Sequence, residues 1–363
     1  MAAVPVLSGS LHAFYLFEVS ESTDLSEVGR QLGETAVPAT LHDKAAGPPE
    51  VRYIQAPIVA PGEALALGEI GGFRARVKFY DYGVVSIRLS RPFEGSWDDL
   101  VRQGQELIEN DPLEDSATAA CHRVVERVRA ALKGVRASFL REDYLALVVH
   151  ADGGAASGDA ILERHGSEIA QMLRGERQPL SLQERDEVLR HRFSYFADDL
   201  VVPAYNAAFV YDTVAAAAST LEMLEFVNSQ LLEFRYHDEV LESELTQIYA
   251  GLQERRGVVD RLIGRRSNRA ARRLHALYID VNELTDRLEN AVKLVGDLYL
   301  ARLSGLAAAR LGLDHWKRNV EEKLKTLNDI YRFAIEQTGM AQANLLEFVI
   351  VLILVIEFGM LFG

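Results

Sequence analysis

Cysteine is nearly absent from this sequence of 363 residues, in which Cys121 stands alone. A single thiol excludes an internal disulfide and a metal site built from several thiolates, so a reducing compartment fits the chain. We expect Cys121 to be an inert packing residue rather than a nucleophile. The N-terminus is typical of neither a secretory signal nor a transit peptide, so the bulk of the protein is expected to stay where it is made.

Positive charge is also scarce, because 39 Lys and Arg oppose 53 Asp and Glu and the formal net charge is −14. This balance argues against a nucleic-acid binder that depends on its overall field, although a local basic patch is compatible with it. The sequence contains no HExxH, Walker A, GxSxG or EF-hand pattern. We therefore predict no catalytic residue, no metal site and no cofactor.

Two short stretches leave room for chemistry. The segment VVHADGGAASGDA at 148–160 follows a predicted strand, but it lacks both GxGxxG and a following Lys-Ser/Thr, so a plain loop is favoured over a phosphate cradle. The pair Asp198 and Asp199 would suit a metal or acid–base site, whereas aspartates that cap turns are commoner.

Proline is missing from the last 160 residues, because all ten prolines lie at or before Pro203. Since proline breaks helices, this shift predicts a boundary near residue 212 and a helical second part. We expect an α+β fold in which a mixed α/β domain spans 1–212. A three-helix bundle is expected over 213–344 and a membrane anchor over 345–363.

Alternation of apolar and polar residues marks the clearest strands. In residues 73–80 every second residue is apolar and the residues between are mostly basic, which predicts a strand with one buried face. Alternation resumes at 85–89 after Asp81-Tyr82-Gly83, so we predict a hairpin with Gly83 at positive φ. Further strands are predicted at 11–18, 51–55, 144–150, 200–203 and 207–211, and helices at 97–110, at 114–138 and from the capping box SLQE at 181–184.

The second part carries apolar residues at alternating steps of three and four in 224–252, 274–302 and 320–345. Such spacing is typical of long helices packed as coiled coils, and the breaks between them contain glycine. The simplest arrangement is an antiparallel three-helix bundle about 50 Å long. Asp238 is the one polar core position of the first series, and with Arg235 it is expected to fix the helix register.

The chain ends in LLEFVIVLILVIEFGMLFG, residues 345–363, enough helix to span about 28 Å. We predict a single-pass, tail-anchored helix with the N-terminal domain in the cytoplasm; the alternative is the buried core of an oligomer. Two polar residues lie inside the run, Glu347 and Glu357, and the second would cost about 2.5–3.5 kcal/mol in lipid. The predicted anchor residues are Leu345, Phe348, Val349, Ile350, Leu352, Leu354, Ile356, Phe358 and Leu361.

Arginine is concentrated in one predicted turn, between the first two helices of the bundle. Antiparallel packing would place this turn beside the membrane, where basic residues attract anionic headgroups. Binding of RNA phosphates and a solvated turn are the alternatives. The arginines are Arg255, Arg256, Arg261, Arg265, Arg266, Arg269, Arg272 and Arg273, and they oppose one acid, Asp260.

Four stretches carry a resemblance to a known family: FYDYGVVSIRLSRP, SYFADDLVVPAYNAAFVYD, LEFVNSQLLEFRYHDEVLESEL and LLEFVIVLILVIEFG. Over roughly residues 50–360 the chain resembles the required-for-meiotic-nuclear-division family, also known through Sad-interacting factors. The resemblance implies an α/β domain, long helices and a C-terminal membrane segment, and its mitochondrial member implies support of organellar translation. Without a transit peptide, a bacterial-type inner-membrane member is expected.

The residues that match family-like positions have no catalytic role to inherit. They are Asp81-Tyr82-Gly83, Asp198-Asp199, Gln230-Leu231-Leu232-Glu233, Arg235, Asp238, Glu347 and Glu357. The first functional hypothesis is a non-enzymatic, membrane-tethered scaffold linked to translation. The alternatives are an enzyme with a pocket in the α/β domain and a nucleic-acid tether that uses the arginine-rich turn. Expected partners are anionic lipids and an unidentified protein, with a homo-oligomer, nucleic acid or the ribosome as further candidates.

Overall fold

The computed structural model describes residues 7–39, 56–151, 156–253 and 298–330, together with Ile279 and Arg332. The chain forms two compact units. The first comprises Met1–Tyr236 and Asp286–Asp314, and the second comprises His237–Thr285 and His315–Gly363. Helix α6 (Val214–Gln253) begins in the first unit and ends in the second.

An eight-stranded sheet organises the first unit, with strand order β3-β4-β5-β6-β1-β8-β10-β9. Neighbouring strands are antiparallel except for β8 and β10, which are parallel. The long central strands are β1 (Leu7–Glu18), β6 (Val84–Gly95) and β8 (Leu140–His150). The outer strands are β3 (Val37–Pro38), β4 (Ile58–Pro61), β5 (Arg74–Phe79), β9 (Leu200–Pro203) and β10 (Ala207–Asp212). A separate two-stranded sheet pairs β2 (Ser22–Thr23) with β7 (Leu132–Lys133).

Five helices cover one face of the large sheet and form an apolar core with it. The core joins residues of β1 such as Leu11 and Phe17 to Leu100, Val124 and Ile169 from the helices. Alternate residues of each strand point to opposite faces, so this core takes only half of the side chains of each strand. The helices are α1 (Leu25–Leu32), α2 (Trp97–Asn110), α3 (Glu114–Arg127), α4 (Gly158–Arg174) and α5 (Leu182–Arg190).

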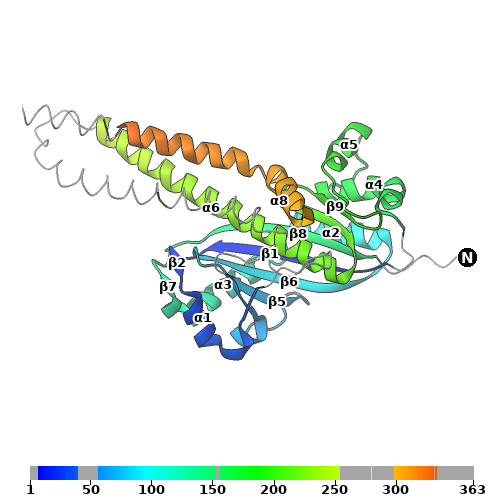
Figure 1. Ribbon diagram of the computed structural model, residues 1–363, viewed down its shortest axis with the longest axis horizontal. Coiled ribbons are helices and arrows are strands. Elements are labelled where there is room, and N and C mark those ends of the chain that lie inside the picture. The colour runs from blue at the N-terminus through cyan, green and yellow to red at the C-terminus, as the bar shows by residue number, and fades with distance from the viewer. Residues whose placement is uncertain are drawn as a thin grey trace, which may run out of the picture. The chain divides into compact units, whose positions relative to one another are not determined.

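The opposite face is covered by the first part of α6 together with α8 (Leu298–Arg310), as Figure 1 shows. The two helices are joined by a buried hydrogen bond of 2.7 Å between the hydroxyl groups of Thr220 and Tyr299. Residues 221–234 of α6 are all buried, because the sheet lies on one side of the helix and other helical residues on the other. The first unit is therefore a three-layer α/β/α arrangement.

The predicted hairpin is confirmed: β5 pairs with β6 in antiparallel register, and Gly83 lies in the connecting turn at φ +91°. The predicted three-helix coiled-coil bundle over 213–344 is wrong. In this range the structure describes the long helix α6, the shorter α8 and a helical segment at 313–330. The positions predicted to form the bundle seam in α6, such as Leu224 and Leu231, lie in the first unit with the sheet. A repeat of three and four residues marks any helix with one buried stripe, so it does not distinguish helix–sheet packing from a bundle.

The predicted transmembrane fold and single-pass membrane location are corrected as well. Within the described ranges, none of the helices combines the length and the apolar character needed to cross a bilayer. The long helix α6 carries glutamates such as Glu222, Glu225 and Glu233 about once per turn, and each would be costly in lipid. Residues 345–363, on which the prediction rested, lie outside the described residues.

In the second unit, the described residues are helical over 237–253 and 315–330. Lys323 joins the two segments, since its Nζ lies 2.9 Å from Asp238 Oδ1 and 2.8 Å from Glu242 Oε2. The contact is partly solvated, because Glu242 exposes 61% of its side chain. This contact is therefore a partly solvated set of ion pairs and not part of the apolar core.

Candidate functional site

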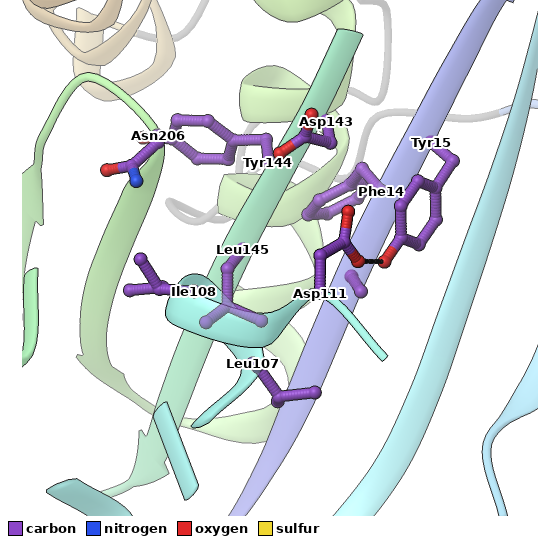
Figure 2. A pocket seen from close by; sticks show the side chains of 10 residues that line it. Phe14, Tyr15, Leu107, Ile108, Asp111, Asp143, Tyr144, Leu145 and Asn206 are labelled. Carbon is purple, nitrogen blue, oxygen red and sulfur yellow. Dashed lines mark hydrogen bonds between the residues drawn. The ribbon is translucent and has the colours of Figure 1, made fainter. Parts of the chain in front are cut away.

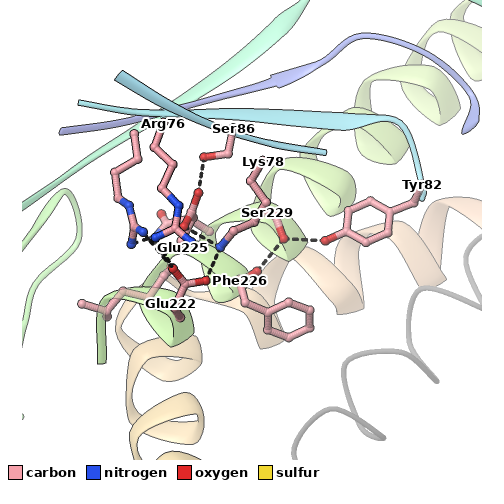
Figure 3. Close-up of polar contacts among 11 residues, drawn as sticks. Arg76, Lys78, Tyr82, Ser86, Glu222, Glu225, Phe226 and Ser229 are labelled. Carbon is pink, nitrogen blue, oxygen red and sulfur yellow. Dashed lines mark hydrogen bonds and ion pairs between the residues drawn. The ribbon is translucent and has the colours of Figure 1, made fainter. Parts of the chain in front are cut away.

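Charged side chains meet in the interior of the first unit, between β5, β6 and α6. Lys78 Nζ lies 2.5 Å from Glu222 Oε2 and 2.6 Å from Glu225 Oε2, and Arg88 Nη2 lies 2.8 Å from Glu222 Oε1. The Ser86 hydroxyl donates a hydrogen bond of 2.6 Å to Glu225 Oε1. These four charged side chains each expose 8% or less. Figure 3 shows Lys78 reaching from the sheet toward Glu222 and Glu225. We call Lys78, Ser86, Arg88, Glu222 and Glu225 the charge cluster.

The local sequence places each member of the charge cluster by periodicity. On the strands, Lys78 is directly opposite Ser86 and Arg76 is opposite Arg88, so their side chains share one face of the sheet. On the helix, Glu222 and Glu225 are three residues apart and therefore lie on one side. A basic strip of strand thus meets an acidic strip of helix.

The pKa shifts of Glu222 and Arg88 agree with this pairing of acidic and basic side chains. Burial alone would raise the pKa of Glu222, but the charges of Lys78 and Arg88 outweigh it and lower that pKa from 4.5 to about 2. Burial alone would lower the pKa of Arg88, but Glu225 and Glu222 outweigh it and raise that pKa. Lys78 also lies 5.8 Å from the ring centroid of Tyr80. Both shifts favour the charged forms of Glu222 and Arg88, which form an ion pair within the charge cluster.

A polar group of hydroxyls and an amide continues this interface along α6. The hydroxyl groups of Tyr82 and Ser229 are 2.6 Å apart, and Gln230 Nε2 donates to the Tyr82 hydroxyl at 2.9 Å. Tyr82 stacks on Tyr80 with ring centroids 5.1 Å apart. The interface between sheet and helix is consequently fixed by directional contacts over several turns of α6.

Buried charge pairs contribute little net stability, because the loss of hydration offsets the attraction between them. They do select one arrangement, since a displaced helix would leave buried charges without their counterparts. The charge cluster is covered by α6 and its groups bind one another, so its geometry supports positioning of the helix rather than reaction with a substrate.

A small pocket lies at the other side of β1 and β8, near the end of α2. Its volume is about 40 Å³, room for a few water molecules, and Figure 2 shows the Tyr15 hydroxyl donating to Asp111 Oδ1 beside it. Burial and the contact with Asp111 raise the pKa of Tyr15 well above its ordinary value, and burial also raises that of Asp111. Asp143 and Asn206 also line the pocket. The carboxyl groups offer acid–base chemistry, but the space is too small for an organic substrate.

The structure separates the predicted pair Asp198 and Asp199. Asp199 is buried and accepts hydrogen bonds from the backbone N–H groups of Tyr195 at 2.8 Å and Phe196 at 3.0 Å. Asp198 is exposed. The contacts of Asp199 hold the turn that precedes β9, which is the capping arrangement, and the two carboxyl groups do not form a shared site.

Arg235 and Asp238 have different partners. Arg235 pairs with Glu142 near the start of β8, and burial raises the pKa of Glu142 although Arg235 opposes this. Asp238 pairs with Lys323. Arg235 is thus part of the contact between α6 and the sheet, whereas Asp238 belongs to the second unit.

The remaining predicted site residues lie outside the described residues. These are the arginine-rich turn (Arg255, Arg256, Arg261, Arg265, Arg266, Arg269, Arg272, Arg273) and the terminal segment with Glu347 and Glu357. Lipid or phosphate binding by the arginine-rich turn stays a prediction. Within the described ranges, no group of three or more His, Cys, Asp or Glu side chains is arranged to hold a metal ion.

The sheet domain of this chain is similar to known proteins. The family described as uncharacterized protein MJ0711, N-terminal domain, matches residues 8–217, which include every strand of the large sheet except the first residue of β1. Uncharacterized protein MJ0711 of Methanocaldococcus jannaschii is 23% identical over 200 residues, 55% of this chain and 60% of that relative. The chain therefore spans about three fifths of the relative. No solved structure matches.

The matched region ends within the first turn of α6, so it contains Lys78, Ser86 and Arg88 but not Glu222 or Glu225. The resemblance to the required-for-meiotic-nuclear-division family stays a prediction, because nothing in these matches concerns that family. The chain belongs to the family of the MJ0711 N-terminal domain.

Proposed function

We propose that this protein is a non-catalytic adaptor whose sheet domain holds α6 in a fixed position and presents the rest of that helix to a protein partner. One observation carries the proposal: the charged side chains of the charge cluster pair with one another and thereby bind α6 to the sheet. Lysine, arginine and paired glutamates at such distances would otherwise suggest catalysis. Here they lie beneath a helix and neutralise one another.

The length of α6 supports the same function. At 40 residues it is about 60 Å long, and only its first part, up to Tyr236, belongs to the unit that contains the sheet. Its later residues include exposed polar positions such as Glu239, Ser243 and Gln247. A helix fixed at one end and polar at its surface offers a contact face of defined register to a partner.

The partner class is a protein or a ribonucleoprotein. Ribosomal particles are the first to test, because the resemblance described above implies a link with translation. The small pocket gives weaker support to the alternative function, an enzyme. Its volume of about 40 Å³ beside Asp111 and Tyr15 accommodates water rather than an organic substrate.

The test compares two charge-matched double variants of the full chain. In Glu239→Lys with Gln247→Lys the changes fall on the exposed side of α6, and in Glu94→Lys with Gln183→Lys they fall on exposed positions of the sheet domain. A partner recovered with the wild-type chain would be identified, produced separately and titrated against all three proteins. We expect the α6 variant to bind at least about tenfold more weakly, equivalent to about 1.4 kcal/mol, and the control to bind normally.

Two results would overturn the adaptor. One is equal binding by both variants, which would remove α6 from the contact. The other is turnover of a substrate by the purified protein that is lost in Asp111→Asn while the fold is retained, which would make the pocket an active site.

A further inference from the structure

The loop that connects α5 to β9 carries two large aromatic rings at the surface of the sheet domain. Tyr195 exposes 38% of its surface and Phe196 exposes 48%. Their rings pack edge to face, with ring centroids 4.9 Å apart. Single exposed apolar residues are ordinary on protein surfaces, but two adjoining rings form a continuous apolar face. Neither the charge cluster nor the adaptor function uses this face.

The loop is held in one conformation by contacts on both sides of the rings. Phe193, which precedes them, exchanges two backbone hydrogen bonds of 2.8 Å with Val201 of β9. The buried carboxylate of Asp199 accepts from the backbone N–H groups of both exposed residues. Tyr195 also meets the buried ring of Tyr299 edge to face, with ring centroids 6.0 Å apart. The rings are therefore fixed in place, and a ligand would bind them at little cost in conformational entropy.

Two arginines near the rings carry charges that no acidic side chain balances. Arg192 is exposed and lies three residues before Tyr195, and its guanidinium donates to the backbone oxygen of Leu189 at 3.0 Å. Arg302 of α8 is also exposed, and it follows Tyr299 by three residues, so it shares the side of α8 that meets the loop. Among the residues that the structure describes, neither arginine has an ion-pair partner.

The acidic residues of this region leave the two charges uncancelled. Arg190 and Glu187 pair with each other at 2.9 Å, so together they are neutral. The sequence of α8 contains no acidic residue. Asp198 is the exposed acid of the loop, since Asp199 is buried and bound to the backbone. The charge beside the rings is therefore locally positive, although the whole chain carries −14.

Exposed rings beside unpaired arginines match the chemistry of single-stranded RNA. Its unstacked bases bind aromatic rings by stacking, and the phosphates that join the bases bind arginine. A duplex offers the same phosphates but keeps its bases stacked inside the helix, so exposed rings add little to its binding. An apolar peptide would cover the rings but would leave the arginines without a counterion.

We propose that the loop 192–198 and the adjacent side of α8 form a binding surface for single-stranded RNA. Bases stack on Tyr195 and Phe196, and phosphates contact Arg192 and Arg302. This RNA surface belongs to the first unit, whereas the exposed residues of α6 proposed to meet a partner belong to the second. The inference goes beyond the adaptor function. Because its test uses only the purified chain and synthetic RNA, its failure and the failure of the adaptor are distinguishable.

The test measures binding of the full chain to a fluorescently labelled single-stranded RNA of about 12 nucleotides, a length within the range that such surfaces cover. We expect Tyr195→Ala and Phe196→Ala each to weaken binding about tenfold, because each removes a stacking ring. Tyr205→Ala is the matched control and should bind normally, since Tyr205 is 54% exposed but follows the other end of β9. The same RNA annealed to its complement should bind at least about tenfold more weakly than the single strand.

The phosphate contacts are tested by replacing Arg192 and Arg302 with glutamine. Loss of two contacts to a single strand should reduce the slope of log affinity against log salt concentration by about 1.4. The control is Arg123→Gln with Arg127→Gln, which removes two exposed arginines of α3, on the opposite face of the sheet, and should keep the slope. Asp198→Asn removes the exposed acid of the loop and should strengthen binding, which a loss of structure would not do.

Urea unfolding of each variant checks that the fold is retained. If Tyr195→Ala unfolds, Phe196→Ala and Asp198→Asn still test the RNA surface, because they keep the contact of Tyr195 with Tyr299. Absence of RNA binding by the wild-type chain, equal binding of the duplex, or ring variants that bind like Tyr205→Ala would each overturn the proposal. Self-association of the wild-type chain that Phe196→Ala abolishes, without any RNA binding, would overturn it too and would assign the rings to a contact between copies.

Discussion

Lys78 Nζ and Glu225 Oε2 lie 2.6 Å apart, and the two side chains expose only 2% and 1% of their surface. One residue lies on β5 and the other on a helix that begins more than 130 residues later in the chain. Their contact means that the sheet face left free by α1–α5 is built to receive one particular helix in one register.

Lys78→Met tests whether the charge cluster holds α6. The change keeps most of the side-chain volume but leaves Glu222 and Glu225 with Arg88 as their remaining buried cation. Breaking a buried ion pair from one side typically costs about 3–5 kcal/mol, so we expect the free energy of unfolding in urea to fall by that order.

The matched control for that change is Lys133→Met, which removes an exposed lysine of β7 and should alter stability by no more than about 0.5 kcal/mol. Adding Glu225→Leu to Lys78→Met should restore part of the loss, because the uncompensated carboxylate is then gone. A loss equal to that of the control would show that the charge cluster does not position the helix.

Glu222→Gln tests the electrostatic part of the same interface through its pH dependence. The pKa of Glu222 is lowered from 4.5 to about 2, since the charges of Lys78 and Arg88 outweigh the effect of burial. A lowered pKa contributes stability above the unfolded value, and this contribution disappears as the pH falls from 4.5 toward 2. The difference in unfolding free energy between wild type and Glu222→Gln should therefore be constant above about pH 5 and shrink in acid.

Thermal or urea unfolding at a series of pH values measures that difference. If the difference in unfolding free energy between wild type and Glu222→Gln grew as the pH fell, the lowered pKa of Glu222 would be contradicted.

Asp199→Ala tests the assignment of this residue to a turn. The buried carboxylate accepts from the backbone N–H groups of Tyr195 and Phe196, and leaving such donors unsatisfied costs about 1–3 kcal/mol. Asp198→Ala removes the exposed neighbour and should change stability by less than about 0.5 kcal/mol. Equal losses of stability in the two variants would contradict the turn assignment and support a joint role of Asp198 and Asp199.

The elements of the sheet domain were largely predictable because their signals are local. The strand–turn–strand of β5 and β6, the capping serine before α5 and the strands β9 and β10 all follow from periodicity within a few residues. The candidate site was not predictable in this way. The alternation that identified β5 predicts that Arg76 and Lys78 face solvent. In the structure α6 covers Lys78, which is only 1% exposed.

The sequence does contain a weak signal for this cover. Glu222, Glu225, Ser229 and Glu233 form a polar strip at helical spacing inside a segment that is rich in apolar residues. Such a strip ordinarily faces water, and only its match with the basic strip of β5 and β6 indicates a buried contact. Matching two strips so far apart requires the sheet order, in which β5 and β6 lie next to each other on the side that α6 crosses.

Gly83→Ala tests how tightly the hairpin turn is bound to the chain beside it. Gly83 has φ +91°, and an added Cβ would lie 1.9 Å from the backbone oxygen of Ser20, so both the conformation and the space exclude alanine. We expect a loss of at least about 1–3 kcal/mol. Gly29→Ala is the control with the opposite sign, because this position in α1 has open space and alanine favours helix by about 0.5–1 kcal/mol. If Gly83→Ala unfolded at the same urea concentration as the wild type, the contact between this turn and the end of β1, next to Glu18, would not be rigid.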